Sequence, residues 1–259
     1  MNAIADGDAR VRFDDVHLSV RGRAIFRGLS CRFPRGRISV ILGGSGAGKS
    51  TLLRSIGGLV RPQRGVVTVA GVEVSALPEH ALYEVRQRIG MLFQHGALLD
   101  SLSVFDNVAL PLREHTDLSV PDVAAEVERR LTAVGLPGTG ALFPRELSGG
   151  MLRRAALARA IVTDPEIVLC DEPFSGLDPI NVRRIEKLFG TLNQQLGLTF
   201  LITSHHIPSS LRMADQIVFL LEGTAISGTP SELRHHADAR VSRFFAAELD
   251  ADMMNGDDA

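Results

Sequence analysis

The strongest constraint on this chain is a glycine-rich stretch between a short apolar run and a helical one. Residues 43–51 fit the pattern G-x-x-x-x-G-K-[ST]. In that pattern, backbone N–H groups at a helix N-terminus cradle phosphates, the lysine reaches the β- and γ-phosphates, and the serine is placed for Mg²⁺. The stretch therefore predicts a nucleotide site made of Gly43, Gly44, Ser45, Gly46, Ala47, Gly48, Lys49, Ser50 and Thr51.

The flanks of this loop favour a phosphate site over an incidental glycine turn. Ile38–Leu42 is a short apolar run, like a buried parallel strand, and residues 52–56 are helix-like until two glycines end the pattern. Strand, glycine loop and helix thus follow one another in the order that phosphate binding requires. A glycine-rich turn that happens to precede a Lys-Ser pair is the alternative, and it leaves the flanking strand and helix unexplained.

Composition narrows the class of protein. The 259 residues are 45% hydrophobic and 22% charged, which is ordinary for a soluble protein with a sizeable core. A net charge of −2 gives no sign of a surface for nucleic acid or anionic membrane. No apolar run approaches the ~20 residues that span a bilayer, and residues 1–8 do not resemble a secretory signal. Any membrane role is therefore expected to come through a partner.

The order of the expected elements predicts an α/β fold of the P-loop NTPase class, with a mostly parallel sheet. Residues 11–33 and 66–74 alternate like antiparallel strand pairs, and we place the first pair at an edge beside the nucleotide strand. Beyond Gln94 the strand pattern stops, which predicts an inserted helical subdomain. Cys31 and Cys170 lie in strand-like runs and are expected as buried reduced thiols rather than as a disulfide.

These patterns divide the chain into four parts. They are a flexible N-terminus (1–10), a nucleotide-binding α/β core (11–94 and 164–228), a helical subdomain (95–163), and a C-terminal helix with an acidic tail (229–259). In the last part, an apolar stripe at helical spacing predicts a helix that packs or docks through one face. The stripe comprises Val241, Phe244, Phe245, Glu248 and Leu249.

Asp171 and Glu172 end the strand-like run 167–170, at the sheet edge where ligands of parallel sheets collect. An aspartate there can hold Mg²⁺ alongside phosphate oxygens. The adjacent glutamate points differently along a strand, so it suits a separate role as the general base that polarises the attacking water. A solvated acidic pair is the alternative, which the glycine loop makes the weaker one.

A second anion site is predicted where Ser148, Gly149 and Gly150 open a helix rich in Arg and Ala. Ser148 is a favourable N-cap residue, and the glycines expose backbone N–H groups at the positive end of the helix. Such a site could hold a γ-phosphate. A capped helix that binds nothing is the alternative, and the helix taken alone favours it.

Six motifs in this order resemble those of ABC-type ATPases, over residues 11–228. Residues 43–51 resemble a Walker A loop, Gln94 a Q-loop, residues 147–151 the LSGGQ signature, residues 167–172 a Walker B strand, residues 175–178 a D-loop, and His205 the switch histidine. The resemblance implies an ABC nucleotide-binding domain that binds ATP with Mg²⁺ and hydrolyses the ATP. It also implies a head-to-tail dimer, in which each ATP lies between the Walker A loop of one copy and the signature of the other.

The resemblance further assigns roles to individual residues. His205 is expected to contact the γ-phosphate and to support Glu172. The implied catalytic residues are Glu172, His205, Gln94 and Lys49; the implied Mg²⁺ ligands are Ser50, Gln94 and Asp171; and the ATP contacts beyond the Walker A loop are Ser148, Gly149, Gly150 and Asp178.

The chain departs from the family pattern in three places. Met151 stands where the signature usually has glutamine, and His206 follows the switch histidine where aspartate is common. The position at which these ATPases stack an aromatic ring on adenine falls near Val20 or Arg21, neither of which is aromatic. Arg21 offers a guanidinium plane for such stacking.

Residues 82–86, 91–98, 104–115, 171–174, 178–180 and 240–245 resemble the ATPases of Mla phospholipid-transport systems. That resemblance implies a peripheral protein at the cytoplasmic face of the inner membrane, which helps to move phospholipids between that membrane and the periplasm and so maintains outer-membrane lipid asymmetry. The implied partners are integral-membrane permease subunits, an MCE-domain lipid-binding protein and a small STAS-domain protein, without nucleic acid. Phe105, Val108 and Leu112 are candidates for the groove that receives the permease, with ordinary helix packing as the alternative.

Two other functions remain open at this point. One is the ATPase of a small-molecule importer, for example for an amino acid, although methionine-type importers carry a C-terminal regulatory domain. The other is a non-transport ABC protein of DNA repair or translation, although the chain shows neither the heptads nor the tandem repeat typical of that class.

Overall fold

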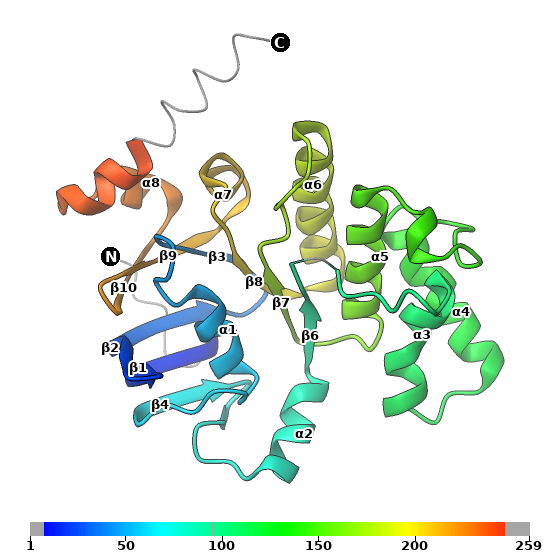
Figure 1. Cartoon of the computed structure of the whole chain (residues 1–259), viewed down its shortest axis with the longest axis horizontal. Helices are drawn as coiled ribbons and strands as arrows, with labels where there is room; N and C mark the ends of the chain where they lie inside the picture. Colours follow the sequence, from blue (N-terminus) through cyan, green and yellow to red (C-terminus); the bar gives the residue numbers. More distant parts are fainter. Residues whose placement is uncertain (1–7, 95, 247–259) are drawn as a thin grey trace.

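The computed structural model describes residues 8–94 and 96–246 as two sheets with helices packed on them (Figure 1). The strands are β1 (Ala9–Val20), β2 (Arg23–Pro34), β3 (Ile38–Leu42), β4 (Arg64–Val69), β5 (Val72–Glu73), β6 (Ile89–Leu92), β7 (Ile167–Asp171), β8 (Thr199–Thr203), β9 (Gln216–Leu221) and β10 (Thr224–Gly228). The helices are α1 (Lys49–Ile56), α2 (Glu79–Gln87), α3 (Val104–His115), α4 (Val120–Ala133), α5 (Gly149–Ile161), α6 (Pro179–Leu196), α7 (Ile207–Met213) and α8 (Pro230–Arg234).

The larger sheet has the strand order β10-β9-β3-β8-β7-β6. Its inner strands are parallel, and only β10 runs antiparallel to its neighbour β9. All five residues of β3 are buried because both faces of the strand are covered, which is why its sequence is apolar apart from Ser39. The expected α/β fold with a mostly parallel sheet is therefore confirmed.

The antiparallel strand pairs lie elsewhere than expected. β1 and β2 do not form an edge beside β3; together with β4 and β5 they make a separate sheet with the order β2-β1-β4-β5. The antiparallel edge of the larger sheet is instead β10, a strand that the sequence patterns do not predict. Helix α1 fills the space between the two sheets, since Leu52, Leu53 and Ile56 share one buried cluster with residues of both.

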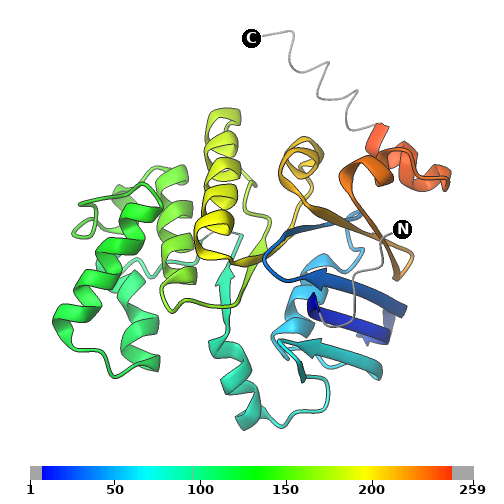
Figure 2. The same ribbon diagram turned by 180° about the vertical axis from the view of Figure 1, so that it is seen from behind.

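Helices α3, α4 and α5 form one end of the molecule, and the antiparallel sheet lies toward the opposite end (Figures 1 and 2). Each of these three helices is preceded by an N-cap serine whose hydroxyl accepts a backbone N–H three residues later, which satisfies an otherwise unpaired donor. Val108 and Leu112 of α3 are buried in the core, so ordinary helix packing accounts for them, whereas Phe105 is only partly buried.

The C-terminal stripe packs on its own chain. Residues 239–246 are helical, and Val241 and Phe245 are 0% and 1% exposed. The ring of Phe244 lies 4.7 Å from that of Phe219 on β9. Glu248, Leu249 and the acidic tail lie outside the described residues.

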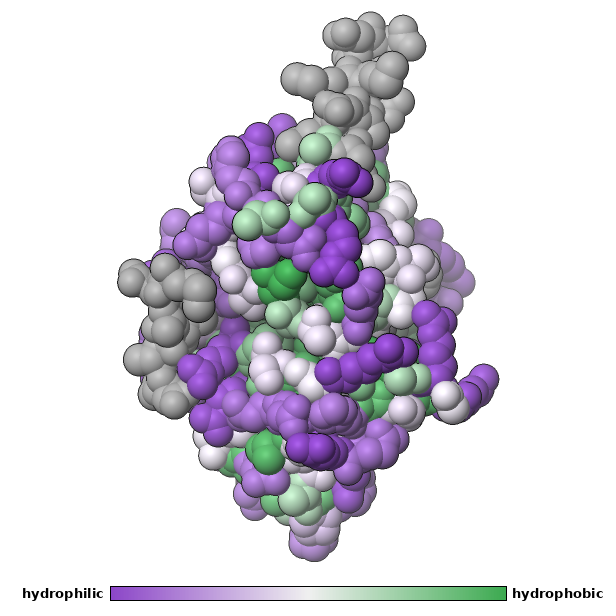
Figure 3. All heavy atoms as spheres, turned by 90° about the vertical axis from the view of Figure 1, so that its left-hand side faces the viewer, coloured by the Kyte–Doolittle hydropathy of each residue, from purple (hydrophilic) through white to green (hydrophobic). Residues whose placement is uncertain are grey.

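The face on the β2 and β10 side is largely hydrophilic, with small hydrophobic spots between polar side chains (Figure 3).

Candidate functional site

The glycine loop links β3 to α1, and two of its glycines are required by geometry. Gly48 has φ 101°, and a Cβ there would lie 2.6 Å from Ile25 Cγ2. Gly43 has φ 150°, and a Cβ there would lie 2.8 Å from the carbonyl oxygen of Leu220. Since L-residues rarely adopt such φ values and both spaces are filled, only glycine fits without strain. The loop is thereby held close against the antiparallel sheet and β9.

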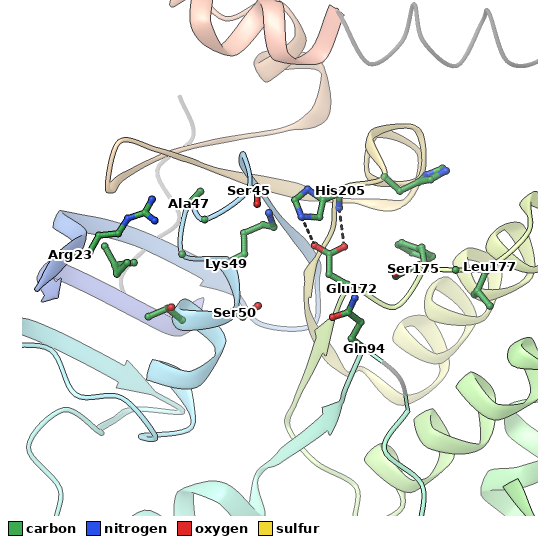
Figure 4. Close-up of a pocket in the computed structure, with 17 residues that line it drawn as sticks. Arg23, Ser45, Ala47, Lys49, Ser50, Gln94, Glu172, Ser175, Leu177 and His205 are labelled. Atoms are coloured by element: carbon green, nitrogen blue, oxygen red, sulfur yellow. Dashed lines mark hydrogen bonds and ion pairs between the residues drawn. The ribbon is translucent and has the colours of Figure 1, made fainter. Parts of the chain in front are cut away.

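A cavity of about 710 Å³ opens beside this loop (Figure 4). It is lined by residues 45–51 of the loop, by Gln94, Glu172, residues 174–177, His205 and His206, and by Arg23 and Ile25 of β2. Gln94, Glu172 and His205 follow β6, β7 and β8 at their carboxyl ends, where ligands of parallel sheets bind. The structure thus brings most of the expected site residues to one cavity.

Lys49 is the first residue of α1 and is 7% exposed. Its Nζ donates to the carbonyl oxygens of Gly43 at 2.8 Å and Gly44 at 3.4 Å, so the ammonium group lies over the loop. Burial lowers the pKa of Lys49, and the nearby carboxylates of Glu172 and Asp171 act in the opposite direction. The ammonium group is therefore placed to contact an anion bound in the loop.

Ser50 and Asp171 provide the oxygens that a magnesium ion prefers. Ser50 Oγ donates to Asp171 Oδ1 at 3.1 Å, and Thr203 Oγ1 donates to the same oxygen at 2.6 Å. A carboxylate, a hydroxyl and the side-chain oxygen of Gln94 fit Mg²⁺, which binds few protein oxygens and completes its shell with phosphate and water. Thr203, which orients Asp171, was not identified from the sequence because β8 is distant along the chain.

Glu172 is held by His205. The backbone N–H of His205 donates to Glu172 Oε2 at 3.1 Å, and ring Nε2 lies 3.2 Å from Oε1. Oε1 is buried and, apart from this contact with the ring, has no hydrogen-bond donor among the described residues. Burial raises the pKa of Glu172, and the charges of His205 and Lys49 moderate the rise. A carboxylate with a raised pKa and one free oxygen is suited to accept a proton.

Glu172 also adopts a backbone conformation that its sequence does not indicate. Its φ is +48°, a left-handed value that is uncommon outside glycine. Its backbone N–H donates to Thr203 Oγ1 at 3.0 Å. The strand ends at Asp171, and this turn of the backbone directs the two neighbouring carboxylates to separate places.

Ser148, Gly149, Gly150 and Asp178 do not line this cavity. Ser148 caps α5 by accepting the Met151 N–H at 3.3 Å, and its side chain is exposed. A Cβ at Gly150 would lie 2.8 Å from Asn181 Oδ1, and Asn181 in turn donates to Asp178 Oδ2 at 2.5 Å. Asp178 also caps α6, and Asn181 of that helix packs against Gly150 at the start of α5. Within one chain, these four residues form a second surface next to the first.

Two arginines of α5 connect that surface with the cavity, and neither was identified from the sequence. Arg153 donates to the carbonyl oxygens of Phe93 at 3.4 Å and Ser175 at 2.9 Å. Arg159 donates to those of Gly96 at 2.9 Å and Ala97 at 2.7 Å. Helix α5 therefore holds the backbone on both sides of Gln94 as well as the segment after Glu172. The roles of Arg153 and Arg159 depend on contacts with residues distant in the sequence, and such contacts leave no local sequence pattern.

The candidates for stacking on adenine also need correction. Val20 and Arg21 do not line the cavity; Arg21 lies in the turn between β1 and β2 with φ +50°. Arg23 and Ile25, at the start of β2, line it instead. A Cβ at Gly46 would lie 3.4 Å from Arg23 Nη2, so the guanidinium group lies against the glycine loop. Arg23 thus presents a planar guanidinium group beside the glycine loop.

Among the described residues, no helix is both long enough and apolar enough to cross a membrane. Cys31 and Cys170 are free and buried, as expected. Burial raises the pKa of both thiols.

Comparison with protein families matches residues 26–175 to the ABC transporter family. MlaF of Escherichia coli strain K12, an intermembrane phospholipid transport system ATP-binding protein, is 46% identical over 231 residues, or 89% of this chain and 86% of that protein. MlaF of Haemophilus influenzae is 45% identical over 229 residues, or 88% of this chain and 87% of that protein. The probable ribonucleotide transport ATP-binding protein mkl of Mycobacterium bovis is 41% identical over 85% of this chain and 62% of that protein.

Solved structures with the same fold include ATP-hydrolysing cassettes. The dimeric post-hydrolysis structure of the ATP-binding cassette MJ0796, bound to ADP and Pi, has a TM-score of 0.76 at 28% identity over 85% of this chain and 98% of that chain. The structure of cbiO1 from Clostridium perfringens, part of the ABC transporter complex cbiONQ, has a TM-score of 0.82 at 27% identity. The match covers 94% of this chain and 97% of that chain. Motifs, fold and relatives agree: the chain belongs to the ABC transporter family, as an ATP-binding subunit that hydrolyses ATP to drive transport.

Proposed function

We propose that this chain is the ATPase subunit of a phospholipid transporter, bound to the cytoplasmic face of the inner membrane through permease subunits. The observation that carries the proposal is the 46% identity with MlaF across nearly all of both chains. On this proposal an MCE-domain lipid-binding protein and a small STAS-domain protein complete the assembly. ATP hydrolysis would then drive phospholipid movement between the inner membrane and the periplasm.

The loop and Lys49 would bind the triphosphate. Residues 45–51 line the cavity where α1 begins, and the positive N-terminal end of a helix favours an anion. Ser50, Asp171 and Gln94 would hold Mg²⁺, for the reasons of ligand chemistry given above. When bound, this ion supplies charge neutralisation for the phosphate oxygens. Lys49 Nζ would exchange its bonds to loop carbonyls for bonds to phosphate.

Glu172 would act as the general base. Its buried Oε1 would accept a proton from water as the water oxygen bonds to the γ-phosphorus. The bond between the γ-phosphorus and the oxygen that bridges it to the β-phosphorus would break, leaving ADP and phosphate. His205, which already holds Oε2 through its backbone N–H, would contact the γ-phosphate through its ring. The raised pKa of Glu172 strengthens it as a base relative to an exposed carboxylate.

A second copy of the chain would complete the site. Ser148, Gly149 and Gly150 lie outside the cavity of their own chain, yet Ser148 and Gly149 are exposed at the N-terminus of α5. We place them against the γ-phosphate bound by the other copy, with Asp178 beside them. MJ0796, a cassette of the same fold, is a dimer with ADP and Pi. This arrangement would account for the position of Ser148, Gly149 and Gly150 outside the cavity of their own chain.

One further observation favours a different cargo. The similarity to mkl, which is named as a ribonucleotide transport protein, supports solute import as the second candidate. Affinity purification of the full-length chain from detergent-solubilised membranes, followed by identification of the membrane subunit and assay of bound lipid, separates the two candidates. A permease with an MCE-domain protein and bound phospholipid supports lipid transport. A solute-binding protein without an MCE-domain protein would overturn it in favour of import.

A further inference from the structure

His206, which follows His205, caps helix α7 with its imidazole ring. Nδ1 of His206 accepts the backbone N–H of Ser209 at 3.2 Å. Its own backbone N–H donates to Ser204 Oγ at 2.9 Å, and its ring lies 6.3 Å from that of Phe174. A side-chain acceptor at this position satisfies one of the unpaired N–H groups of the first helical turn. The cap therefore depends on a lone pair at Nδ1.

The same nitrogen has a second partner. Ser209 Oγ lies 2.7 Å from His206 Nδ1 and also donates a very short hydrogen bond to Glu186 Oε1 on α6. Glu186 is 9% exposed and accepts from Arg212 Nε at 3.1 Å and from Nη2 at 2.6 Å. Burial raises the pKa of Glu186, but the bonds from Arg212 and Ser209 outweigh it and hold that pKa below its ordinary value. The carboxylate stays charged and keeps drawing the Ser209 proton toward itself.

These contacts define two proton states of His206. With Nδ1 unprotonated, the ring accepts the Ser209 N–H and caps α7. With Nδ1 protonated, the ring instead donates to Ser209 Oγ, whose hydroxyl donates to Glu186, and the cap bond is lost. A positive charge at the N-terminus of a helix is also unfavourable. Protonation thus exchanges the cap of α7 for a chain of bonds to α6.

The exchange reaches the catalytic pair through the backbone. His205 and His206 are consecutive, and the backbone N–H of His205 is the group that holds Glu172 Oε2. We propose that His206 is a positioning residue for His205: its unprotonated ring caps α7 and so keeps His205 on Glu172, and protonation of the ring loosens that hold. The inference rests on the roles proposed above for Glu172 and His205.

The charged groups around His206 come from three elements. Glu186 and Arg183 lie on α6, with Arg183 Nη1 3.7 Å from Glu186 Oε2, and Arg212 lies on α7. Glu172 follows β7 and contacts the neighbouring His205. Imidazole is the side chain whose charge ordinarily changes between pH 5 and 8, so acidification across that range is the means of testing the exchange. The raised pKa of Glu172 can also contribute to a pH dependence, which is why the test compares variants rather than relying on the wild-type profile alone.

The test is the ratio of ATP hydrolysis rates at about pH 8 and about pH 6, measured on the full-length chain in its transporter complex. H206N keeps a favourable N-cap acceptor that does not titrate. An imidazole cap can take up a proton on acidification and an amide cap cannot, so the ratio for the wild type should exceed that for H206N by up to roughly fivefold, the factor that corresponds to the ~1 kcal/mol of an N-cap. S209A removes the hydroxyl that stabilises the protonated state, so its loss of activity should begin at lower pH than in the wild type.

Amide hydrogen exchange over residues 207–213, corrected for the intrinsic effect of pH, gives a readout that does not depend on catalysis. Protection of α7 should fall on acidification in the wild type and stay constant in H206N. Equal rate ratios, or equal changes in protection, would overturn the inference. A wild-type complex that hydrolyses no ATP at either pH would instead overturn the proposed function, and this inference with it.

Discussion

His205 lies against both carboxylate oxygens of Glu172: its backbone N–H donates to Oε2 at 3.1 Å, and its ring Nε2 lies 3.2 Å from Oε1. The two residues follow β8 and β7, which pair in parallel, so neighbouring strands deliver them to the same edge. The contact fixes the orientation of a buried carboxylate whose raised pKa suits it to accept a proton. This pairing is the basis for assigning Glu172 as the general base.

Replacing Glu172 by Gln should slow ATP hydrolysis by ~10² to 10⁴, which is the usual effect of losing a general base. Gln still offers an oxygen to the His205 N–H, so ATP affinity should change little, and an ATP-bound dimer should accumulate. Steady-state hydrolysis, ATP binding and size-exclusion chromatography measure these effects. Glu84→Gln, which changes an exposed glutamate on α2, is the matched control. Normal turnover in E172Q would disprove the assignment.

Replacing Lys49 by Ala should weaken ATP binding roughly tenfold to a hundredfold, because a charge-assisted hydrogen bond contributes about 1.5 to 3 kcal/mol. Lys49 is buried over the glycine loop, whereas Arg54 on the same helix is exposed. Arg54→Ala should therefore retain ATP affinity. Equilibrium titration with labelled ATP provides the comparison, and unchanged affinity in K49A would rule out a phosphate contact by this lysine.

Arg23→Ala should weaken ATP binding by roughly twofold to thirtyfold, which corresponds to the ~0.5 to 2 kcal/mol of a cation–π contact. Arg23→Tyr should restore affinity, because an aromatic ring can stack on adenine from the same position. Arg21→Ala serves as the control, since Arg21 does not line the cavity. If R21A weakened binding and R23A did not, the stacking residue would be Arg21 after all.

The contrast between Arg21 and Arg23 illustrates what the sequence could predict. The glycine loop, Asp171 and Glu172 were identifiable because each follows an apolar strand at a fixed spacing, and local spacing is a property of the sequence. Arg23 and Thr203 reach the site only through the way strands distant in sequence pack together. No local pattern records such contacts.

The sheet arrangement and the C-terminal stripe were limited in the same way. Alternation along β1 and β2 predicts antiparallel pairing, but it does not say whether the pair joins the parallel sheet or, as found, forms a second sheet across α1. Likewise the spacing of Val241 and Phe245 predicts a buried helix face without saying what buries it. The core of this same chain buries that helix face, so deleting residues 238–259 would remove core side chains as well as the tail.

Phe245→Ala should destabilise the fold by about 3 to 5 kcal/mol, as truncation of a buried phenylalanine usually does. The side chain is 1% exposed, and its ring lies 6.0 Å from that of Phe219 on β9. Arg243→Ala, an exposed residue of the same helix, should change stability by at most ~0.5 kcal/mol. Urea denaturation measures the free energy of unfolding of the two variants. Equal values would mean that the helix does not pack as described.

Cysteine cross-linking examines whether two copies share each ATP. Ser45 lines the cavity, Ser148 is exposed outside it, and both can be changed to Cys with little change in shape. The native thiols of Cys31 and Cys170 are buried, and burial raises their pKa values, so they should not compete. In the E172Q background, S45C/S148C chains should form covalent dimers with a short cross-linker in the presence of ATP and Mg²⁺, and much less without them. If ATP produced no such dimer while E172Q still bound ATP, the signature of one copy would not complete the site of the other.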